Sequence, residues 1–209
     1  MATNLIICGA GGHAKVVIET IQESDLYSIK GLIVENSEKI GSELCGIKII
    51  DEEMNLHKYL HHSHAFVAIG NVKNYKPRHN VYSNLKLAGF PLANIFSSKS
   101  IISPSAIFGE GNFVAAGAII TSGVSISDNC ILNTGCIIEH DCFIGTNVHV
   151  ASGAILLGSV HVGDDSLIGA GSTIKQGVSI GSRCIIGAGS VVLSDVPSDS
   201  TVVGVPAKI

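Results

Sequence analysis

The side chains best suited to chemistry in this sequence lie within residues 137–150, which read IIEHDCFIGTNVHV. His140 stands between Glu139 and Asp141, and His149 follows nine residues later. A histidine with a pKa of about 6.5 can take a proton from an amine or a hydroxyl at neutral pH. A carboxylate beside it favours the charged ring and fixes which nitrogen carries the proton. The pattern predicts a general base at His140, oriented by Asp141 or by Glu139.

Metal binding is the alternative chemistry for such histidines. His140, His149 and His161 are separated by nine and twelve residues, which places them on different edges of the coil described below. Their surroundings contain few charges and offer no fourth ligand for zinc. The second histidine group, HKYLHHSH at residues 57–64, is more typical of a polar helix or loop. We therefore expect no metal.

The element that must position His140 is indicated by a repeat of six residues. Sixteen consecutive positions at this spacing are apolar: Ile102, Phe108, Val114, Ile120, Ile126, Leu132, Ile138, Ile144, Val150, Leu156, Val162, Ile168, Ile174, Ile180, Ile186 and Val192. Because apolar residues make up 46% of the chain, chance gives such a run about once in 10⁵ to 10⁶ trials. An ordinary sandwich of short strands does not hold one register for so long. The repeat predicts a parallel β-helix.

Strand alternation then assigns a direction to each side chain. The large residue and the small residue two positions before it point inward, the neighbours of the large residue point outward, and the remaining pair turns a corner. Three such edges would make a triangular coil of about 18 residues. This register places His140 and Asp141 at a corner. It places Glu139 and His149 on the outer face, so we expect none of the four to be a core residue.

The first half of the chain has the pattern of a small Rossmann-like α/β domain. Residues 4–22, NLIICGAGGHAKVVIETIQ, read as a strand, a glycine turn and a helix, and the segments SIKGLIVE and HAFVAIG read as later strands. Gly9-x-Gly11-x-x-Ala14 is a weak dinucleotide fingerprint that lets a phosphate approach the start of a helix. The fingerprint expects a ribose-binding acid about 20 residues further on, and Glu35 stands near that position. Residues 91–104 look like a joint, so we predict domains at 1–96 and 97–209.

Composition excludes several classes of function. The net charge of −4 and the charged fraction of 14% argue against a nucleic acid or an anionic membrane as partner. Mean hydropathy is +0.44, yet no apolar run approaches the ~18 residues of a membrane span. We see no secretory leader and expect a cytoplasmic protein. Four of the six cysteines fall on small inward positions of the repeat, so we expect free thiols.

Four separated motifs together resemble the sialic acid O-acetyltransferase and UDP-4-amino-sugar N-acetyltransferase group of hexapeptide-repeat acyltransferases. They are GAGGHAK, NTGCIIEHDCFIG, HVASGAILLGSVHVG and VVGVPAK, and they run from the start of the chain to its end. The resemblance implies a left-handed parallel β-helix after the Rossmann-like domain. It also implies acetyl-CoA as co-substrate, a nucleotide-sugar substrate bound by the first domain, and a homotrimer.

The resemblance implies a role for individual residues as well. His140 would be the general base, Asp141 would raise its basicity, and His149 would contact acetyl-CoA. The backbone at later turns would line the cofactor groove, at Gly158, Ala170 and Ala188. The nucleotide sugar would be bound by Gly11, Gly12, His13, Glu35 and Gly70. Many relatives carry two adjacent acids after the second strand, whereas this chain has Glu35 followed by Asn36.

We therefore expect an N-acetyltransferase that acts on a UDP-4-amino-4,6-dideoxy sugar for bacterial surface glycan biosynthesis. His13 in the glycine loop favours this branch over the sialic acid branch. A sialic acid O-acetyltransferase is the alternative enzyme, with a hydroxyl in place of the amine. A non-catalytic β-helix scaffold or nucleotide-sugar sensor is the alternative class, although a scaffold has no need of Glu-His-Asp at an exposed corner.

Overall fold

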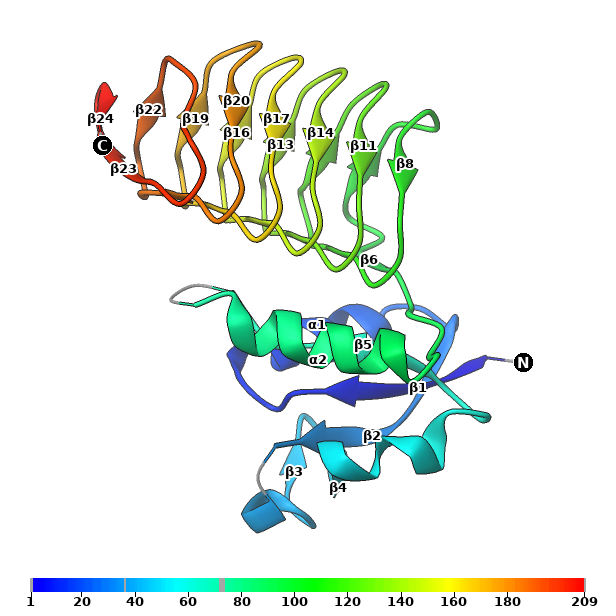
Figure 1. Cartoon of the computed structure of the whole chain (residues 1–209). Coiled ribbons are helices and arrows are strands. Elements are labelled where there is room, and N and C mark those ends of the chain that lie inside the picture. The colour runs from blue at the N-terminus through cyan, green and yellow to red at the C-terminus, as the bar shows by residue number, and fades with distance from the viewer. Residues whose placement is uncertain (1, 36, 72–73, 209) are drawn as a thin grey trace. The chain divides into compact units, whose positions relative to one another are not determined.

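The computed structural model describes residues 2–35, 37–71 and 74–208 (Figure 1). The chain divides into two compact units, Met1–Ser98 and Lys99–Ile209. Each unit has its own core.

The first unit is built on a five-stranded sheet in the order β3-β4-β2-β1-β5. Its strands are β1 (Thr3–Cys8), β2 (Tyr27–Val34), β3 (Glu43–Leu44), β4 (Ile47–Glu52) and β5 (His64–Val67). All neighbours are parallel except β3 and β4. Around the sheet lie α1 (Gly12–Gln22), α2 (Lys76–Leu87) and two 3₁₀ segments, η1 (Ser37–Lys39) and η2 (Glu53–Tyr59); β6 (Ile95–Phe96) ends the unit. The strand, glycine turn and helix expected at residues 4–22 are confirmed, as is the Rossmann-like character of the sheet.

Burial explains why these segments adopt these elements. The second half of β1, Leu5–Cys8, is fully buried, as expected for a parallel strand that is covered on both faces. Helix α1 buries Ala14, Val17, Ile18 and Ile21, the spacing of a single apolar stripe. Neither helix, nor any other in the described part of the chain, has the length and apolar character that a bilayer span requires.

The turn between β1 and α1 depends on one glycine. Gly9 has a φ of +116°, and a Cβ there would lie 3.0 Å from the carbonyl oxygen of Ala68. A side chain at this position would therefore be strained and crowded. Because Gly9 has no side chain, the chain can turn from β1 into α1 directly beside the segment that follows β5.

The second unit is a parallel β-helix of two-residue strands. They are β7 (Ile101–Ile102), β8 (Ile107–Phe108), β9 (Phe113–Val114), β10 (Ile119–Ile120), β11 (Ser125–Ile126), β12 (Ile131–Leu132), β13 (Ile137–Ile138), β14 (Phe143–Ile144), β15 (His149–Val150), β16 (Ile155–Leu156), β17 (His161–Val162), β18 (Leu167–Ile168), β19 (Thr173–Ile174), β20 (Ser179–Ile180), β21 (Ile185–Ile186) and β22 (Val191–Val192). The coil ends in β23 (Thr201–Gly204) and β24 (Ala207–Lys208), which are antiparallel.

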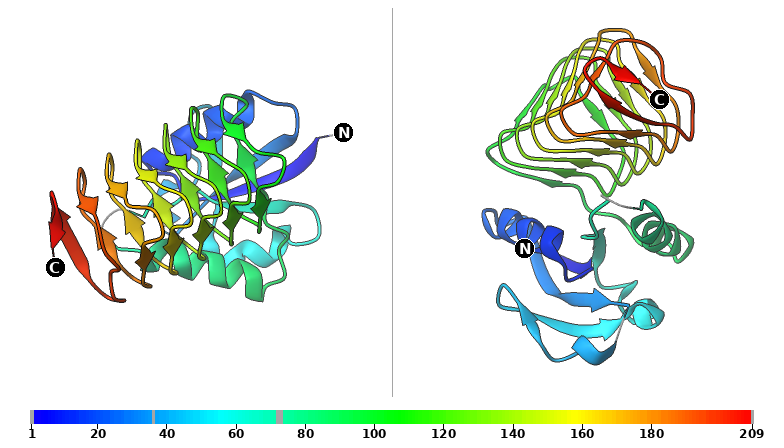
Figure 2. Two further views of the ribbon diagram at one scale, coloured as in Figure 1. Left: turned by 90° about the horizontal axis from the view of Figure 1, so that it is seen from above. Right: turned by 90° about the vertical axis from the view of Figure 1, so that its left-hand side faces the viewer.

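The strands of this unit stack into three faces. Face 1 contains β9, β12, β15, β18, β21 and β23; face 2 contains β7, β10, β13, β16, β19 and β22; face 3 contains β8, β11, β14, β17 and β20. Ile119 pairs with Ile137, and Ile137 pairs with Ile155, so each interval between these residues is one full coil. The expected triangular coil is confirmed, and Figure 2 (right) shows its cross-section. We name the corners 1–2, 2–3 and 3–1 after the faces that they join.

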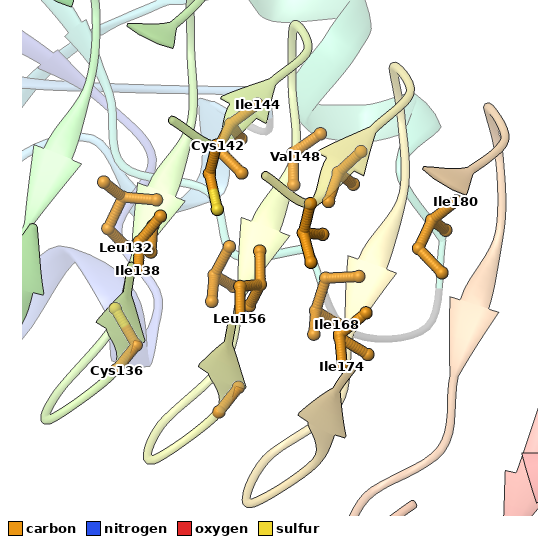
Figure 3. Packing of buried hydrophobic residues seen from close by; sticks show 14 of the residues in the cluster. Leu132, Cys136, Ile138, Cys142, Ile144, Val148, Leu156, Ile168, Ile174 and Ile180 are labelled. Atoms are coloured by element: carbon orange, nitrogen blue, oxygen red, sulfur yellow. The ribbon is translucent and has the colours of Figure 1, made fainter. Parts of the chain in front are cut away.

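The core of the coil is a column of alternating large and small side chains. Leu132, Ile138 and Ile144 point inward together with the smaller Cys136 and Cys142 (Figure 3). Every described large residue of the six-residue repeat from Val114 onward is buried. All six cysteines are free thiols, and the four on the repeat, Cys130, Cys136, Cys142 and Cys184, are buried as predicted.

Candidate functional site

The chain turns corner 2–3 at His140 and Asp141, immediately after β13 ends at Ile138. Backbone hydrogen bonds tie this corner to the coils on both sides. The Asp141 N–H donates to the carbonyl oxygen of Ser122 (3.0 Å), and the Ser159 N–H donates to that of His140 (2.8 Å). The two side chains therefore extend from a backbone that is held in place.

The imidazole of His140 and the carboxylate of Asp141 form a pair. His140 Nδ1 lies 2.9 Å from Asp141 Oδ2, and the side chains are 51% and 68% exposed. Asp141 has a φ of +60°, a conformation that aspartate tolerates better than most residues. A proton on Nδ1 makes this hydrogen bond and leaves the lone pair of Nε2 free to accept a proton.

The ring therefore contacts Asp141 and not its other acidic neighbour. Among the described residues, Glu139 makes no hydrogen bond to the His140 ring, whereas Asp141 does. The backbone of Gly158, one coil further on at the same corner, lies directly against the ring. A Cβ built on Gly158 would lie 2.5 Å from His140 Nε2.

His149 lies on face 1, in β15, in register with Ile131 and Leu167. Its neighbour Val150 points into the core, so the His149 side chain points outward, as the register predicts. It is nevertheless only 5% exposed, and Asn133 Nδ2 donates to its Nε2 at 3.2 Å. An outward direction from the coil therefore does not mean exposure to solvent at His149.

Ala170 and Ala188 lie one coil apart at corner 1–2, and each is the first residue of a turn out of face 1. The residues predicted to act in catalysis and to bind the cofactor thus form two groups within one chain. His140, Asp141 and Gly158 are at corner 2–3, whereas Ala170 and Ala188 are at corner 1–2, the corner that follows the face of His149. Face 2 separates the two corners, so one coil by itself does not bring them together.

In the first unit, the carboxyl ends of β1, β2 and β5 border two adjoining hollows, which we call the cleft. The larger has a volume of about 680 Å³ and the smaller about 490 Å³. All five residues expected to bind a nucleotide sugar line them: Gly11 in both, Glu35 in the larger, and Gly12, His13 and Gly70 in the smaller. Ligands of parallel α/β sheets bind at this edge. A Cβ on Gly70 would lie 3.8 Å from the Cβ of His13, which places the two loops side by side.

The cleft also contains residues that we did not predict from the sequence. Lys76, Asn80 and Asn84 of α2 line the larger hollow together with Asn74. Their spacing of four residues puts them on one face of the helix, and this polar stripe is the signal that could have identified them. Glu53, at the start of η2, adds a second carboxylate beside Glu35.

Asp51 is the residue that holds η2, and hence Glu53, against the cleft. Its carboxylate accepts four hydrogen bonds, from the Glu52 N–H and from the side chains of Asn55, Lys58 and Tyr59. Burial would raise the pKa of Asp51, but these donors outweigh it and lower the pKa to about 2. The second acid that relatives carry after β2 would fall on Asn36, which lies outside the described residues. Glu53 provides an acid in the cleft from another element.

The pH dependence of stability should show what it costs to ionise Glu53 in the cleft. Burial, and after it the charge of Glu35, raise the pKa of Glu53. A carboxyl with a raised pKa stabilises the folded state below its ordinary pKa, and this contribution is lost as the pH rises through the raised value. Glu53→Gln should therefore melt like wild type near pH 4 and roughly 2 °C higher at pH 8. Thermal melts across this range test it, with Glu52→Gln, which does not line the cleft, as control. Equal melting temperatures at pH 8 would contradict the argument.

No three His, Cys, Asp or Glu side chains in the described ranges are grouped so that they could bind a metal ion. The chemistry available at corner 2–3 is that of the imidazole and its carboxylate, namely proton transfer to and from a ligand. At the cleft it is hydrogen bonding to a polar, phosphate-bearing ligand by the glycine loop, amides and carboxylates.

Comparison with known proteins identifies relatives of both units. The family model of the PglD N-terminal domain matches residues 4–85, and that of the hexapeptide repeat of succinyl-transferase matches residues 159–194. No curated protein sequence matches the chain.

Several solved structures match almost the whole chain. PerB from Caulobacter crescentus, in complex with CoA and GDP-perosamine, is 33% identical with a TM-score of 0.90, over 99% of this chain and 96% of that one. The acetyltransferase domain of PglB from Neisseria gonorrhoeae, in complex with acetyl coenzyme A, is 33% identical with a TM-score of 0.89, over 100% and 99%. WeeI from Acinetobacter baumannii is 28% identical with a TM-score of 0.86, over 99% and 100%. Histidine-to-asparagine and histidine-to-alanine mutants of the perosamine enzyme are also among the matches, each with the same two ligands.

Proposed function

Because the chain belongs to the family of hexapeptide-repeat acetyltransferases that includes PerB and the PglB acetyltransferase domain, we propose that it acetylates the amino group of a nucleotide-linked 4-amino-6-deoxy sugar. Its fold is the one shared by this family, a Rossmann-like domain followed by a left-handed parallel β-helix. The acetyl donor is acetyl-CoA. The observation that carries the proposal is the His140–Asp141 pair at an exposed corner of the coil.

The pair suits acyl transfer from a thioester to an amine. The amine nitrogen attacks the thioester carbonyl carbon, and His140 Nε2 takes a proton from the nitrogen as the C–N bond forms. The tetrahedral intermediate then collapses, the C–S bond breaks, and the sulfur of CoA leaves with a proton returned by Nε2. Throughout, Asp141 keeps the other ring proton on Nδ1 and balances the charge of the protonated ring.

The cleft of the first unit holds the nucleotide. Backbone N–H groups at the start of α1, where the chain has two successive glycines, Gly11 and Gly12, accommodate the diphosphate. Glu35 and Glu53 accept hydrogen bonds from hydroxyls of the ribose. A UDP sugar is our expectation for this chain, while PerB binds a GDP sugar, so both nucleotides belong in the test below.

Acetyl-CoA binds between two copies of the chain. Within one copy, face 2 separates the corner of His140 from the corner of Ala170 and Ala188. The outward side chains of face 2 form an in-register apolar column, Ile101, Ile119, Ile137 and Ile155, followed by Thr173 and Val191. An apolar face of this kind favours a subunit contact, and closed rotational symmetry allows three copies to bury it equally.

The proposed assembly is a homotrimer, in which corner 2–3 of one copy faces corner 1–2 of its neighbour. The base of one chain and the cofactor groove of the next then form one site. Both co-substrates are intracellular metabolites, which supports a cytoplasmic location for the enzyme.

The activity is tested by release of free thiol from acetyl-CoA. The acceptors are a UDP-linked and a GDP-linked 4-amino-6-deoxy sugar, free sialic acid, and buffer alone. We expect release with an amino sugar only, and a product heavier by one acetyl group in the mass spectrum. Release with sialic acid alone would instead identify an O-acetyltransferase. If the folded protein releases no thiol with any acceptor, the proposal is contradicted. The remaining interpretation is then a non-catalytic scaffold or nucleotide-sugar sensor.

A further inference from the structure

Two columns of residues meet at corner 2–3, and each column receives one residue from every coil. One contains Ser122, His140, Gly158 and Gln176, and the other contains Gly123, Asp141, Ser159 and Gly177. In the first column, the only glycine is Gly158, which lies one coil after His140. In the second column, Gly123 lies one coil before Asp141. The His140–Asp141 pair is therefore bordered by a glycine on each side along the coil axis.

The backbone does not require a glycine at position 158. Gly158 is not among the residues with a positive φ, and the equivalent positions on neighbouring coils carry side chains. The space that a side chain would occupy is instead filled by the histidine. A Cβ on Gly158 would lie 2.5 Å from His140 Nε2, 2.6 Å from Cε1 and 3.1 Å from Cδ2. Such contacts are shorter than van der Waals separation, so the ring would have to move.

Gly123 makes room for the carboxylate in the same way. A Cβ there would lie 2.6 Å from Asp141 Oδ1. Gly123 also has a φ of +72°, which by itself favours glycine. Gly177 lies in the same column with a φ of +74° and has nothing within 4 Å of its Cβ position. The two glycines thus share their backbone conformation and differ in the presence of the carboxylate.

We propose that Gly158 and Gly123 are positioning residues, which hold the His140–Asp141 pair in its catalytic geometry by leaving empty the space that each partner fills. This inference rests on the proposed function. The atom displaced by a methyl group on Gly158 is the far end of a half-exposed side chain, so the ring can rotate away at little cost in stability. The same rotation redirects Nε2 and breaks the Nδ1–Oδ2 hydrogen bond, and a displacement of about 1 Å is enough to lower a rate about 100-fold.

Kinetics of Gly158→Ala in two backgrounds test the role proposed for Gly158. In the wild-type background we expect kcat to fall about 10- to 100-fold, with KM for acetyl-CoA within about threefold. In the His140→Ala background, Gly158→Ala should cause no further loss. If it lowers the residual rate by the same factor in both backgrounds, Gly158 acts on the cofactor groove and not through His140, and the inference is overturned.

Gly123→Ala and Gly177→Ala, as a matched pair, test the role proposed for Gly123. Both place a side chain in the left-handed conformation, so both should lower the melting temperature by a similar amount. Only Gly123→Ala should lower kcat, and only it should change the pH at which kcat rises. Equal effects of the two variants on kcat would show that Gly123 matters for its backbone alone.

A crystal structure of Gly158→Ala provides a measurement that does not depend on activity. We expect the imidazole in a different rotamer, without the hydrogen bond to Asp141. A ring in the wild-type position would overturn the inference even if the rate had fallen. If the wild-type protein acetylates no acceptor, the proposed function fails, while this structure still decides whether Gly158 positions the ring.

Discussion

Replacement of His140 with alanine is expected to lower kcat about 10²- to 10⁴-fold. The affinity for acetyl-CoA should change by less than about threefold, because the ring acts on the amine proton during the reaction and not on the bound cofactor. The Nε2 lone pair is left free by the hydrogen bond of Nδ1 to Asp141, and no other described side chain provides a base at corner 2–3 in the same position. Steady-state kinetics and calorimetric titration with CoA measure the two quantities separately.

The matched control for this variant is His161→Ala. His161 is also an exposed histidine of the coil, but it lies on face 3, where its ring is 6.1 Å from that of Phe143. It should retain nearly full activity. His140→Asn keeps much of the size of the ring without a basic nitrogen and should be as impaired as the alanine variant. A kcat for His140→Ala within about threefold of wild type would show that the base has been misassigned.

Introduction of a charge into face 2, by Ile137→Glu, is expected to abolish both the homotrimer and the activity. Ile137 lies in the middle of the outward apolar column, between Ile119 and Ile155. A carboxylate there would be buried without a partner at each contact of a trimer, a cost of several kcal/mol per copy. Light scattering after gel filtration measures the mass, and we expect that of a single chain. Acetyl transfer should fall with it, because corner 2–3 of one chain then no longer meets corner 1–2 of another.

Ile107→Glu is the control for this prediction. Ile107 also points outward, but from face 3, and it is 68% exposed. This variant should remain trimeric and active. A trimeric Ile137→Glu, or a monomer with full activity, would contradict the proposed subunit contact.

Complementation between two inactive variants tests the shared site directly. His140→Ala lacks the base at corner 2–3, and Ala188→Trp blocks corner 1–2. The first variant keeps corner 1–2 intact, and the second keeps corner 2–3 intact. In trimers mixed at random from the two, about one subunit contact in four therefore has both of its corners intact. We expect about a quarter of the wild-type activity to return on co-expression. No recovery in trimers that contain both chains would place the whole site within one chain.

The local pattern of the sequence was sufficient for the direction of each side chain in the coil. Strand alternation and the six-residue spacing depend only on near neighbours, so they predicted the inward cysteines, the corner at His140 and the outward direction of His149. The same holds for the glycine turn between β1 and α1, where close neighbours in the chain determine the backbone. The two-unit organisation and the Rossmann-like sheet followed from the order of these local patterns.

Only the tertiary structure decided which of these residues touch. His140 and Gly158 are in contact because the coil returns to the same corner after one complete turn. No local pattern gives the distance between the imidazole of His140 and the backbone of the next coil. The burial of His149 and the presence of Glu53 beside Glu35 depend on packing between elements that are distant in sequence. The direction of a side chain depends on a few adjacent residues, whereas the distance between residues far apart in the sequence depends on the complete fold.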